Sequence, residues 1–180
     1  MIQPKELFTF KEVDNSDIEL LQRIFKLRVV CRNDDGYITF KKYPNGWFDN
    51  EDFKAKHFVA FDGDKLIAAA RVEFYENINV HPYYPAFEGI GGLPVNEPIA
   101  ILSRIVVLPE YRHHEISREL VLEREVYITQ RKIKNILAYV RTFQIQNFIH
   151  YGFKNIGILN VAKIHWELEP DFYLMHKILY

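Results

Sequence analysis

The feature that most limits the fold of this chain is a continuous apolar run over residues 99–108, interrupted only by Ser103 and Arg104. A short apolar run that does not alternate with polar residues is typical of a strand covered on both faces. A polar connection follows, and from Ile116 the apolar residues recur at helical spacing. The pattern predicts a central buried strand, a short loop and a helix, as in an α/β domain built on one sheet.

The rest of the chain alternates strand and helix patterns. A capping box from Ser16 to Glu19 predicts the start of a first helix that reaches about Cys31. Later in the chain, Thr142 is expected to cap a short helix, and Gly152 to end it in a left-handed conformation. Further strands are expected at residues 7–13, 57–61, 65–75, 135–140, 157–168 and 172–180.

Two stretches lack this patterning. Residues 32–56 are polar, and we interpret them as irregular or short helical structure. Residues 77–98 hold four of the eight prolines and three of the eight glycines, a density that we expect to exclude a regular element. Long loops inside compact domains are usually lids or binding loops. The aromatic residues Tyr83, Tyr84 and Phe87 are therefore candidates for the wall of a ligand pocket.

Composition excludes several classes of function. With 23 Lys+Arg against 24 Asp+Glu, the net charge of −1 gives no overall field that would recruit nucleic acid or anionic lipid. One cysteine, Cys31, excludes an internal disulfide and a Cys-pair zinc site. Adjacent His113 and His114 lack a spaced third ligand, so no metal is expected. Without a signal core or an 18-residue apolar stretch, we expect a cytoplasmic protein with no membrane partner.

The segment from Ile101 to Ser117 has the chemistry of a phosphate site. At the start of a helix the free N–H groups and the helix dipole face one point, where an anion binds without a charged side chain. In this element order, the segment Val107-Leu-Pro-Glu-Tyr-Arg112 and its helix resemble the GNAT (GCN5-related N-acetyltransferase) superfamily. The later segment Asn147-Phe-Ile-His-Tyr-Gly-Phe153 matches the family's last helix and its Gly-Phe exit.

This resemblance covers nearly the whole chain and implies one GNAT-like acyltransferase domain over residues 1–180. The implied fold is α/β of the mixed α+β type: a single central, mixed, mostly antiparallel sheet with helices on both faces. The implied sheet is splayed between the strands at 99–108 and 135–140. The backbone of the first of these strands would pair with the pantetheine arm of acyl-CoA through Ile105, Val106 and Val107.

In that family a loop of the pattern Arg/Gln-x-x-Gly-x-Gly/Ala wraps the pyrophosphate. Arg112 matches its first position, Glu115 stands where the first glycine belongs, and Ser117 where the second small residue belongs. Repulsion between Glu115 and a phosphate about 4 Å away is about 1 kcal/mol in water and several times that in a drier site. Binding survives if Glu115 points outward and pairs with Arg112 or Arg118. The residues implied to hold the phosphates are Arg112, His113, His114, Glu115, Ile116 and Ser117.

A narrower likeness lies inside this one. Arg28, Trp47, Asp52, Arg71 and Leu102-Ser103-Arg104 fall in the order found in acyl-homoserine-lactone synthases and bacterial N-acyl amino acid synthases. Those relatives often take long acyl chains from acyl carrier protein, whose arm bears one phosphate instead of a pyrophosphate.

Arg71, Glu73 and Arg104 are the candidates for substrate binding. A buried arginine needs a partner, which Glu73 or a carboxylate ligand would supply to Arg104. For Arg71 and Glu73, a solvated or mutually paired strand face is an equal alternative.

The resemblance also implies that the usual proton-transfer positions are replaced. Many GNAT enzymes carry a general base where this chain has Ile101, and a tyrosine acid where it has Phe148. Ser103, which shares a strand face with position 101, and His150 on the last helix are the remaining catalytic candidates. Positioning an amine against a thioester supplies several kcal/mol by itself.

The expected function is transfer of an acyl group, acetyl by default, from acyl-CoA to an amine of a small molecule, without a metal. One alternative keeps the fold but uses acyl carrier protein, as an N-acyl amino acid or acyl-homoserine-lactone-type synthase. A second alternative is a catalytically degenerate GNAT-fold protein that only binds ligands. A homodimer is left open.

Overall fold

The computed structural model describes residues 8–33, 36, 38–164 and 172–180. These residues form two compact units along the chain. Unit 1 comprises the described residues up to Val72 together with Arg104–Glu125, and unit 2 comprises Glu73–Ser103 and Val126–Tyr180.

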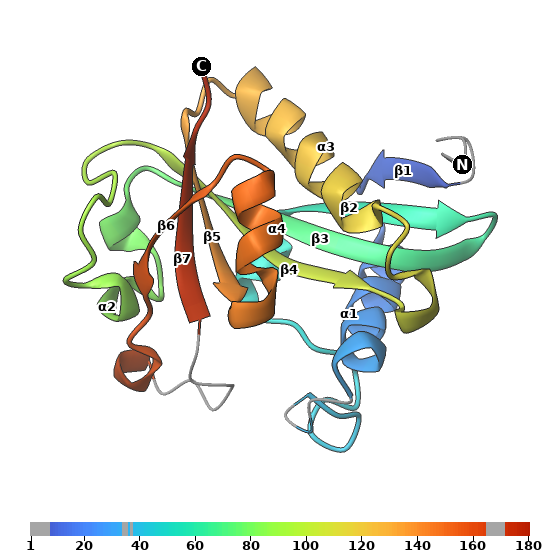
Figure 1. The fold of residues 1–180 in the computed structure, drawn as a ribbon. Coiled ribbons are helices and arrows are strands. Elements are labelled where there is room, and N and C mark those ends of the chain that lie inside the picture. Colours follow the sequence, from blue (N-terminus) through green and yellow to red (C-terminus); the bar gives the residue numbers. More distant parts are fainter. Residues whose placement is uncertain (1–7, 34–35, 37, 165–171) are drawn as a thin grey trace. The chain divides into compact units, whose positions relative to one another are not determined.

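The strands form one seven-stranded sheet in the order β1-β2-β3-β4-β5-β7-β6 (Figure 1). The pairs β1–β2, β2–β3, β5–β7 and β6–β7 are antiparallel, whereas β4 and β5 are parallel. The predicted mixed, mostly antiparallel sheet is therefore confirmed. The strands are β1 (Thr9–Glu12), β2 (Lys56–Asp62), β3 (Lys65–Tyr75), β4 (Ile99–Val107), β5 (Asn135–Arg141), β6 (Lys154–Ile158) and β7 (Phe172–Ile178).

The described residues form four α-helices: α1 (Ile18–Arg32), α2 (Tyr84–Phe87), α3 (Ile116–Gln130) and α4 (Ile145–His150). Short 3-10 turns lie at Asn50–Phe53, Ile78–Val80, Pro109–Tyr111, Thr142–Gln144 and Val161–Ile164. Within the described ranges, none of the helices has the length and apolar character needed to cross a bilayer.

Two predicted helix caps are wrong. The N-cap of α1 is Asp17, whose carboxylate accepts a hydrogen bond from the amide of Leu20 at 3.0 Å. Ser16 lies one residue earlier, because its own amide is held in a turn by Asp14. Thr142 begins a 3-10 turn instead of capping α4.

The predicted stop of α4 at Gly152 agrees with the structure. Gly152 has a φ of 88°, in the left-handed region, and its amide donates to the carbonyl of Ile149. Glycine adopts this conformation without steric conflict, so it ends the helix as expected.

The predicted boundaries fail in two further places. The strand expected at 157–168 is β6, which ends at Ile158 and is followed by the 3-10 turn at Val161–Ile164; residues 165–168 lie outside the described residues. The excursion at 77–98 was expected to hold no regular element, but it contains the one-turn helix α2. Pro85 lies in the first turn of α2, where its missing N–H is not needed, so a proline-rich stretch can still form a turn.

The core of unit 2 lies where β4, β5 and β7 meet the 77–98 excursion. Ile101 and Phe87 are fully buried there, whereas Tyr83 and Tyr84 are partly buried and pack against the cluster. Phe87 is therefore a core residue. The buried members are Ile78, Ala86, Phe87, Ile99, Ile101, Leu137, Leu159, Phe172 and Leu174.

The parallel pairing of β4 and β5 is short. It runs from Ile99 opposite Asn135 to Leu102 opposite Ala138. Arg104, two residues further along β4, has a φ of 53°, which interrupts regular strand geometry. The pairing with β5 thus ends immediately before Ser103, although β4 itself continues to Val107.

Candidate functional site

The loop that leads into α3 has the backbone of a glycine-containing turn without any glycine. His113 and Glu115 have φ values of 75° and 60°. Residues with a Cβ rarely enter this left-handed region, at a cost of about 1–2 kcal/mol each. Glu115, which stands at the first glycine position of the family pattern, therefore has a backbone conformation typical of glycine.

The side chain of Glu115 points away from the loop. It is 71% exposed, and its Oε2 lies 3.7 Å from Nη1 of Arg118. Arg112 instead donates from Nη2 to the carbonyl of Cys31 at 3.2 Å and from Nε to the carbonyl of Val107 at 3.4 Å. Of the two arginines proposed as partners of Glu115, the structure selects Arg118. Because the pair is exposed, it adds little to stability.

The amides of residues 113–117 open onto the start of α3. Among the described residues, no carbonyl or side-chain oxygen accepts a hydrogen bond from them. Ile116 is buried beneath the helix and Ser117 is half-buried, whereas residues 112–115 are exposed. Unpaired amides at the start of a 15-residue helix suit an anion.

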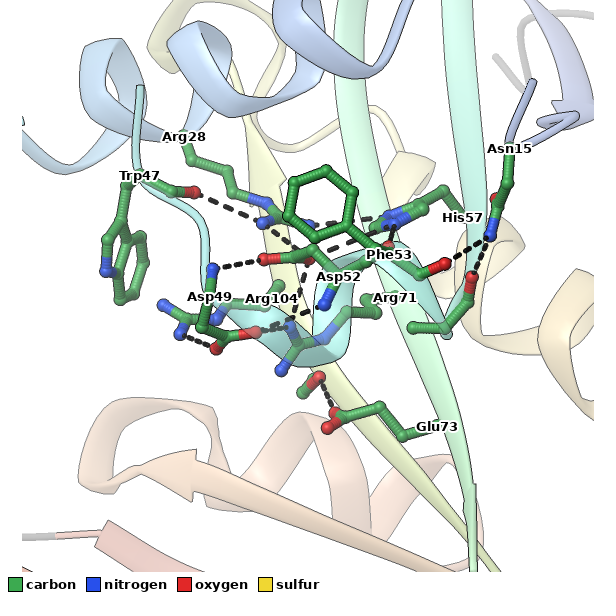
Figure 2. Close-up of polar contacts among 12 residues, drawn as sticks. Asn15, Arg28, Trp47, Asp49, Asp52, Phe53, His57, Arg71, Glu73 and Arg104 are labelled. Atoms are coloured by element: carbon green, nitrogen blue, oxygen red, sulfur yellow. Dashed lines mark hydrogen bonds and ion pairs between the residues drawn. The ribbon is translucent and has the colours of Figure 1, made fainter. Parts of the chain in front are cut away.

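Unit 1 also contains an ionic cluster, by which we mean Arg28, Asp49, Asp52, Arg71 and Arg104 (Figure 2). Arg28 Nη1 is 2.9 Å from Asp52 Oδ1. Arg71 Nη1 lies 2.7 Å from Asp49 Oδ1 and 3.0 Å from Asp52 Oδ1, and Arg104 Nη2 lies 2.6 Å from Asp49 Oδ2. Within the cluster, three guanidinium groups surround two carboxylates.

Both aspartates are ionised at neutral pH. Burial acts to raise the pKa of Asp49, but the charges of Arg71 and Arg104 outweigh it and hold that pKa well below its ordinary value. In the same way Arg28 and Arg71 overcome the effect of burial and lower the pKa of Asp52. Burial lowers the pKa of Arg28 to about 10, so this guanidinium stays charged as well.

His57 completes the cluster as a neutral side chain. Its Nδ1 lies 3.4 Å from Nη2 of Arg28, and its Nε2 lies 2.8 Å from the carbonyl oxygen of Asp52. Since a guanidinium only donates, Nδ1 accepts, and Nε2 carries the proton. Burial, followed by the charge of Arg28, lowers the pKa of His57 to about 4.

Arg104 is the member of the cluster with a donor left over. Its side chain is 8% exposed, and its guanidinium lies 3.7 Å from the ring centroid of Trp47. Among the described residues, its Nη1 has no hydrogen-bond partner. The prediction that Arg104 needs a carboxylate is confirmed, but the partner in the protein is Asp49 and not Glu73.

Sequence reasoning brought five of these residues together through the narrower resemblance: Arg28, Trp47, Asp52, Arg71 and Arg104. It missed Asp49 and His57. A signal for Asp49 is present in its spacing from Asp52, because the two residues cap each other's amides at the turn Asn50–Phe53.

A third missed residue, Arg124 on α3, fixes the strand that carries Arg71. Arg124 is fully buried; its Nη1 donates to the carbonyl of Arg71 at 2.9 Å, and its Nε donates to that of Leu120 at 2.8 Å. Burial lowers the pKa of Arg124 to about 9. It therefore links α3 to β3.

Unit 2 holds a smaller polar group around Glu73. The Oγ of Ser103 donates to Oε2 of Glu73 at 2.5 Å, and the hydroxyl of Tyr75 donates to Oε1 at 3.1 Å. Glu73 is 4% exposed and Ser103 is 3% exposed. Arg71 is buried as well, so the alternative of a solvated strand face is wrong.

The remaining predicted positions are spread over unit 2. Phe148 is buried against Phe153, at 5.2 Å between ring centroids, and Ile101 is fully buried in the core. Neither side chain can exchange a proton. His150 is exposed on α4, and it forms no hydrogen bond with any other described residue.

Nucleophilic catalysis by Cys31 and metal binding have little support. Burial raises the pKa of the Cys31 thiol to about 12, so this thiol is not a nucleophile at neutral pH. In the described part of the chain, no group of three or more His, Cys, Asp or Glu side chains is placed to hold a metal ion.

Comparison with known proteins places this geometry in a family. The model of the acetyltransferase (GNAT) family matches residues 19–153, which include the loop, α3 and all members of the ionic cluster. No curated protein sequence matches the chain.

Several solved structures share the fold. The CoA-dependent acyl-homoserine lactone synthase BjaI, solved with SAM and isopentyl-CoA, is 15% identical, with 96% of this chain and 84% of that chain covered and a TM-score of 0.71. FeeM, an N-acyl amino acid synthase from uncultured soil microbes, is 14% identical, with 95% and 90% covered and a TM-score of 0.64. An acetyltransferase from Streptococcus agalactiae is 15% identical, with 97% and 99% covered and a TM-score of 0.60. By its fold and by the family model that matches most of its length, the chain belongs to the acetyltransferase (GNAT) family.

Proposed function

We propose that this protein transfers an acyl group from acyl-CoA to the amine of a small molecule. The observation that carries the proposal is the left-handed backbone at Glu115, next to the unpaired amides that start α3. A side chain other than glycine opposes this conformation, so the surrounding structure must hold the loop in it. A loop held in that shape presents its amides to a phosphate group.

The donor would lie along β4. The phosphates would contact the amides of residues 113–117 and the pantetheine arm would contact the backbone of Ile105–Val107. Ile105 and Val107 are only half-buried, and β4 no longer pairs with β5 beyond Leu102. An amide of β4 would polarise the thioester carbonyl as the charge develops on its oxygen.

The ionic cluster supports an acceptor that carries a carboxylate. Arg104 keeps Nη1 available while Asp49 occupies its Nη2. Burying a charged N–H group without a hydrogen-bond partner costs more free energy than burying one that is hydrogen-bonded. A carboxylate ligand would therefore be favoured at Nη1 of Arg104. Amino acids combine such a carboxylate with an amine.

The direct test measures binding and turnover together. We expect isothermal calorimetry to show binding of acetyl-CoA or of a longer acyl-CoA. We also expect thiol release from the bound donor to accelerate when free amino acids are added. Absence of binding at millimolar acyl-CoA would refute the proposal.

A second candidate keeps the reaction and replaces the donor by acyl carrier protein. It is favoured by the convergence of Arg28, Trp47, Asp52, Arg71 and Arg104, the residues that suggested the narrower resemblance. Donor competition separates the two candidates: a carrier protein that neither binds nor competes while CoA binds tightly excludes the second one.

A third candidate, a GNAT-fold protein that binds ligands without catalysis, rests on Ile101 and Phe148. Protein-dependent thiol release with any amine of a broad panel would exclude it.

A further inference from the structure

We propose that Arg112 is a positioning residue of the donor site. Its guanidinium ties the glycine-free loop to the last turn of α1 and so keeps the loop in the shape that receives phosphate, instead of binding the phosphate itself. The inference rests on the acyltransferase function proposed above. It attributes part of the affinity for acyl-CoA to a contact between two segments of the protein.

The loop needs support from its surroundings because it does not stabilise its own shape. His113 and Glu115 have left-handed φ values of 75° and 60°, which a Cβ disfavours. The amides of residues 113–117 form no hydrogen bond within the described part of the chain, so none of them compensates this strain. A strained backbone persists only where the structure around it determines it. The segments on either side must therefore hold the loop.

Arg112, the residue immediately before the strained segment, bonds to two elements at once. Its Nη2 donates to the carbonyl of Cys31 at 3.2 Å, and its Nε donates to the carbonyl of Val107 at 3.4 Å. Cys31 lies in the last turn of α1, and Val107 is the last residue of β4. Since Nε and Nη2 form one edge of the planar guanidinium, this edge joins the end of a helix to the end of a strand.

The contact with α1 suits a cation. The last four carbonyl groups of a helix have no partner within the helix, and the partial negative charge at this end attracts cations. The guanidinium of Arg112 therefore satisfies a carbonyl of α1 and is stabilised by the helix dipole. The edge that makes these contacts is not available for a bidentate contact with a phosphate.

Other contacts fix the chain on both sides of the loop. In the 3-10 turn Pro109–Tyr111, the hydroxyl of Tyr111 donates to Oδ2 of Asp62 at 2.8 Å, and Asp62 is the last residue of β2. After the loop, Ile116 is 2% exposed. We therefore expect that loss of the Arg112 contacts relaxes the loop alone, while its two ends stay in place.

The affinity for acetyl-CoA then depends on the strain of the loop. When only a fraction of the molecules has the binding shape, the apparent affinity falls by that fraction. A tenfold loss corresponds to about 1.4 kcal/mol, which lies within the range of strain at one left-handed residue. Without Arg112, we therefore expect binding to be about tenfold weaker.

The first test measures acetyl-CoA binding by calorimetry. Arg112→Met should weaken binding about tenfold. As a matched control, Arg23→Met removes an exposed arginine that also donates to a backbone carbonyl of unit 1, and it should change affinity less than about twofold. Arg112→Lys keeps the charge but lacks the planar edge that reaches two carbonyls, so it should lose nearly as much as Arg112→Met. Wild-type affinity in Arg112→Met or in Arg112→Lys would overturn the inference.

The second test distinguishes positioning from a direct contact with phosphate. In the Arg112→Met background, Glu115→Gly should restore most of the tenfold loss, because glycine adopts a left-handed φ without strain. Glu115→Gln removes the same charge but keeps the Cβ, so in this background it should gain no more affinity than it does in the wild type. If Glu115→Gly has the same effect in both backgrounds, the two positions act independently and Arg112 does not act through the loop.

The third test needs no ligand. In the wild type, Glu115→Gly should raise Tm by about 2 °C, because it removes the strain at this residue. In Arg112→Met the loop is already relaxed, so the same substitution should not raise Tm. An equal rise in both backgrounds would contradict the role of Arg112. If the wild type binds no acyl-CoA, the proposed function fails, whereas these Tm values still decide whether Arg112 holds the loop.

Discussion

Replacing Glu115 by glycine is expected to raise both the stability of the protein and its affinity for acetyl-CoA. With a φ of 60°, Glu115 is strained by about 1–2 kcal/mol, which a glycine would not be. Glycine gains about 0.5–1 kcal/mol of backbone freedom in the unfolded state, which opposes this benefit. The net gain is therefore about 0.5–1 kcal/mol, and Tm should rise by about 2 °C for a chain of this length.

The affinity change has a separate cause. Repulsion between a carboxylate and a phosphate about 4 Å apart is about 1 kcal/mol in a solvated site. Because the side chain of Glu115 turns outward to Arg118, this value is an upper bound, and removing the charge should tighten binding by at most about fivefold. The exposed pair with Arg118 is lost, but such pairs contribute little. The gain should shrink at high salt, because exposed charges are then screened.

Glu115→Gln separates the two contributions. It removes the charge but keeps the Cβ in the left-handed conformation, so affinity for acetyl-CoA should rise without a rise in Tm. Calorimetry at low and high salt measures the first quantity, and thermal unfolding measures the second. As a control ligand, S-acetyl pantetheine lacks the phosphates and should bind all three proteins equally. If neither variant binds acetyl-CoA more tightly, the carboxylate is not beside the phosphates and the site is misplaced.

Three further predictions concern the ionic cluster. Because burial lowers the pKa of His57 from 6.5 to about 4, the unfolded state takes up a proton before the folded one does. The contribution of His57 to the free energy of unfolding is therefore fully present above pH 6.5 and falls by about 3 kcal/mol as the pH drops to 4. Urea unfolding of His57→Gln should show a smaller loss of stability over the same pH range. Asp52→Asn should lose about 3–5 kcal/mol in urea unfolding because Arg28 stays buried without its counter-charge, whereas the surface change Glu51→Gln should lose less than about 0.5 kcal/mol. Arg104→Met should raise KM about tenfold to hundredfold for an amino acid acceptor and leave it unchanged for the corresponding amine without the carboxylate.

Local sequence patterns were sufficient for most of the sheet. The hairpin of β2 and β3 and the central strand β4 follow from apolar periodicity, which short-range sterics and burial dictate. The errors arose where neighbouring residues compete for one role. Asp17 and its predecessor can both cap a helix, and only the turn made by Asp14 decides between them. The apolar pattern after Ile158 continues although the chain has already turned.

The site was harder to predict because it depends on distant residues. Strand alternation shows that Arg71 and Glu73 share a face, but it cannot show whether that face is covered. Arg71 is paired with Asp49, which is 22 residues away in the sequence, in a polar stretch without strong periodicity. The left-handed conformation of Glu115 was invisible as well, because glutamate gives no local sign of it.

The stacking of Arg104 on Trp47 gives the protein an intrinsic optical probe. The centroid of the Trp47 ring lies 3.7 Å from the guanidinium carbon of Arg104. The fluorescence of Trp47 therefore depends on the electric field of this cation, and that field changes when an anion binds to it. An acceptor carboxylate bound to Nη1 would change this field and thereby the emission of Trp47. The chain has one other tryptophan, Trp166, which lies outside the described residues. In a Trp166→Phe variant, acceptor binding would therefore be reported by the fluorescence of Trp47 alone.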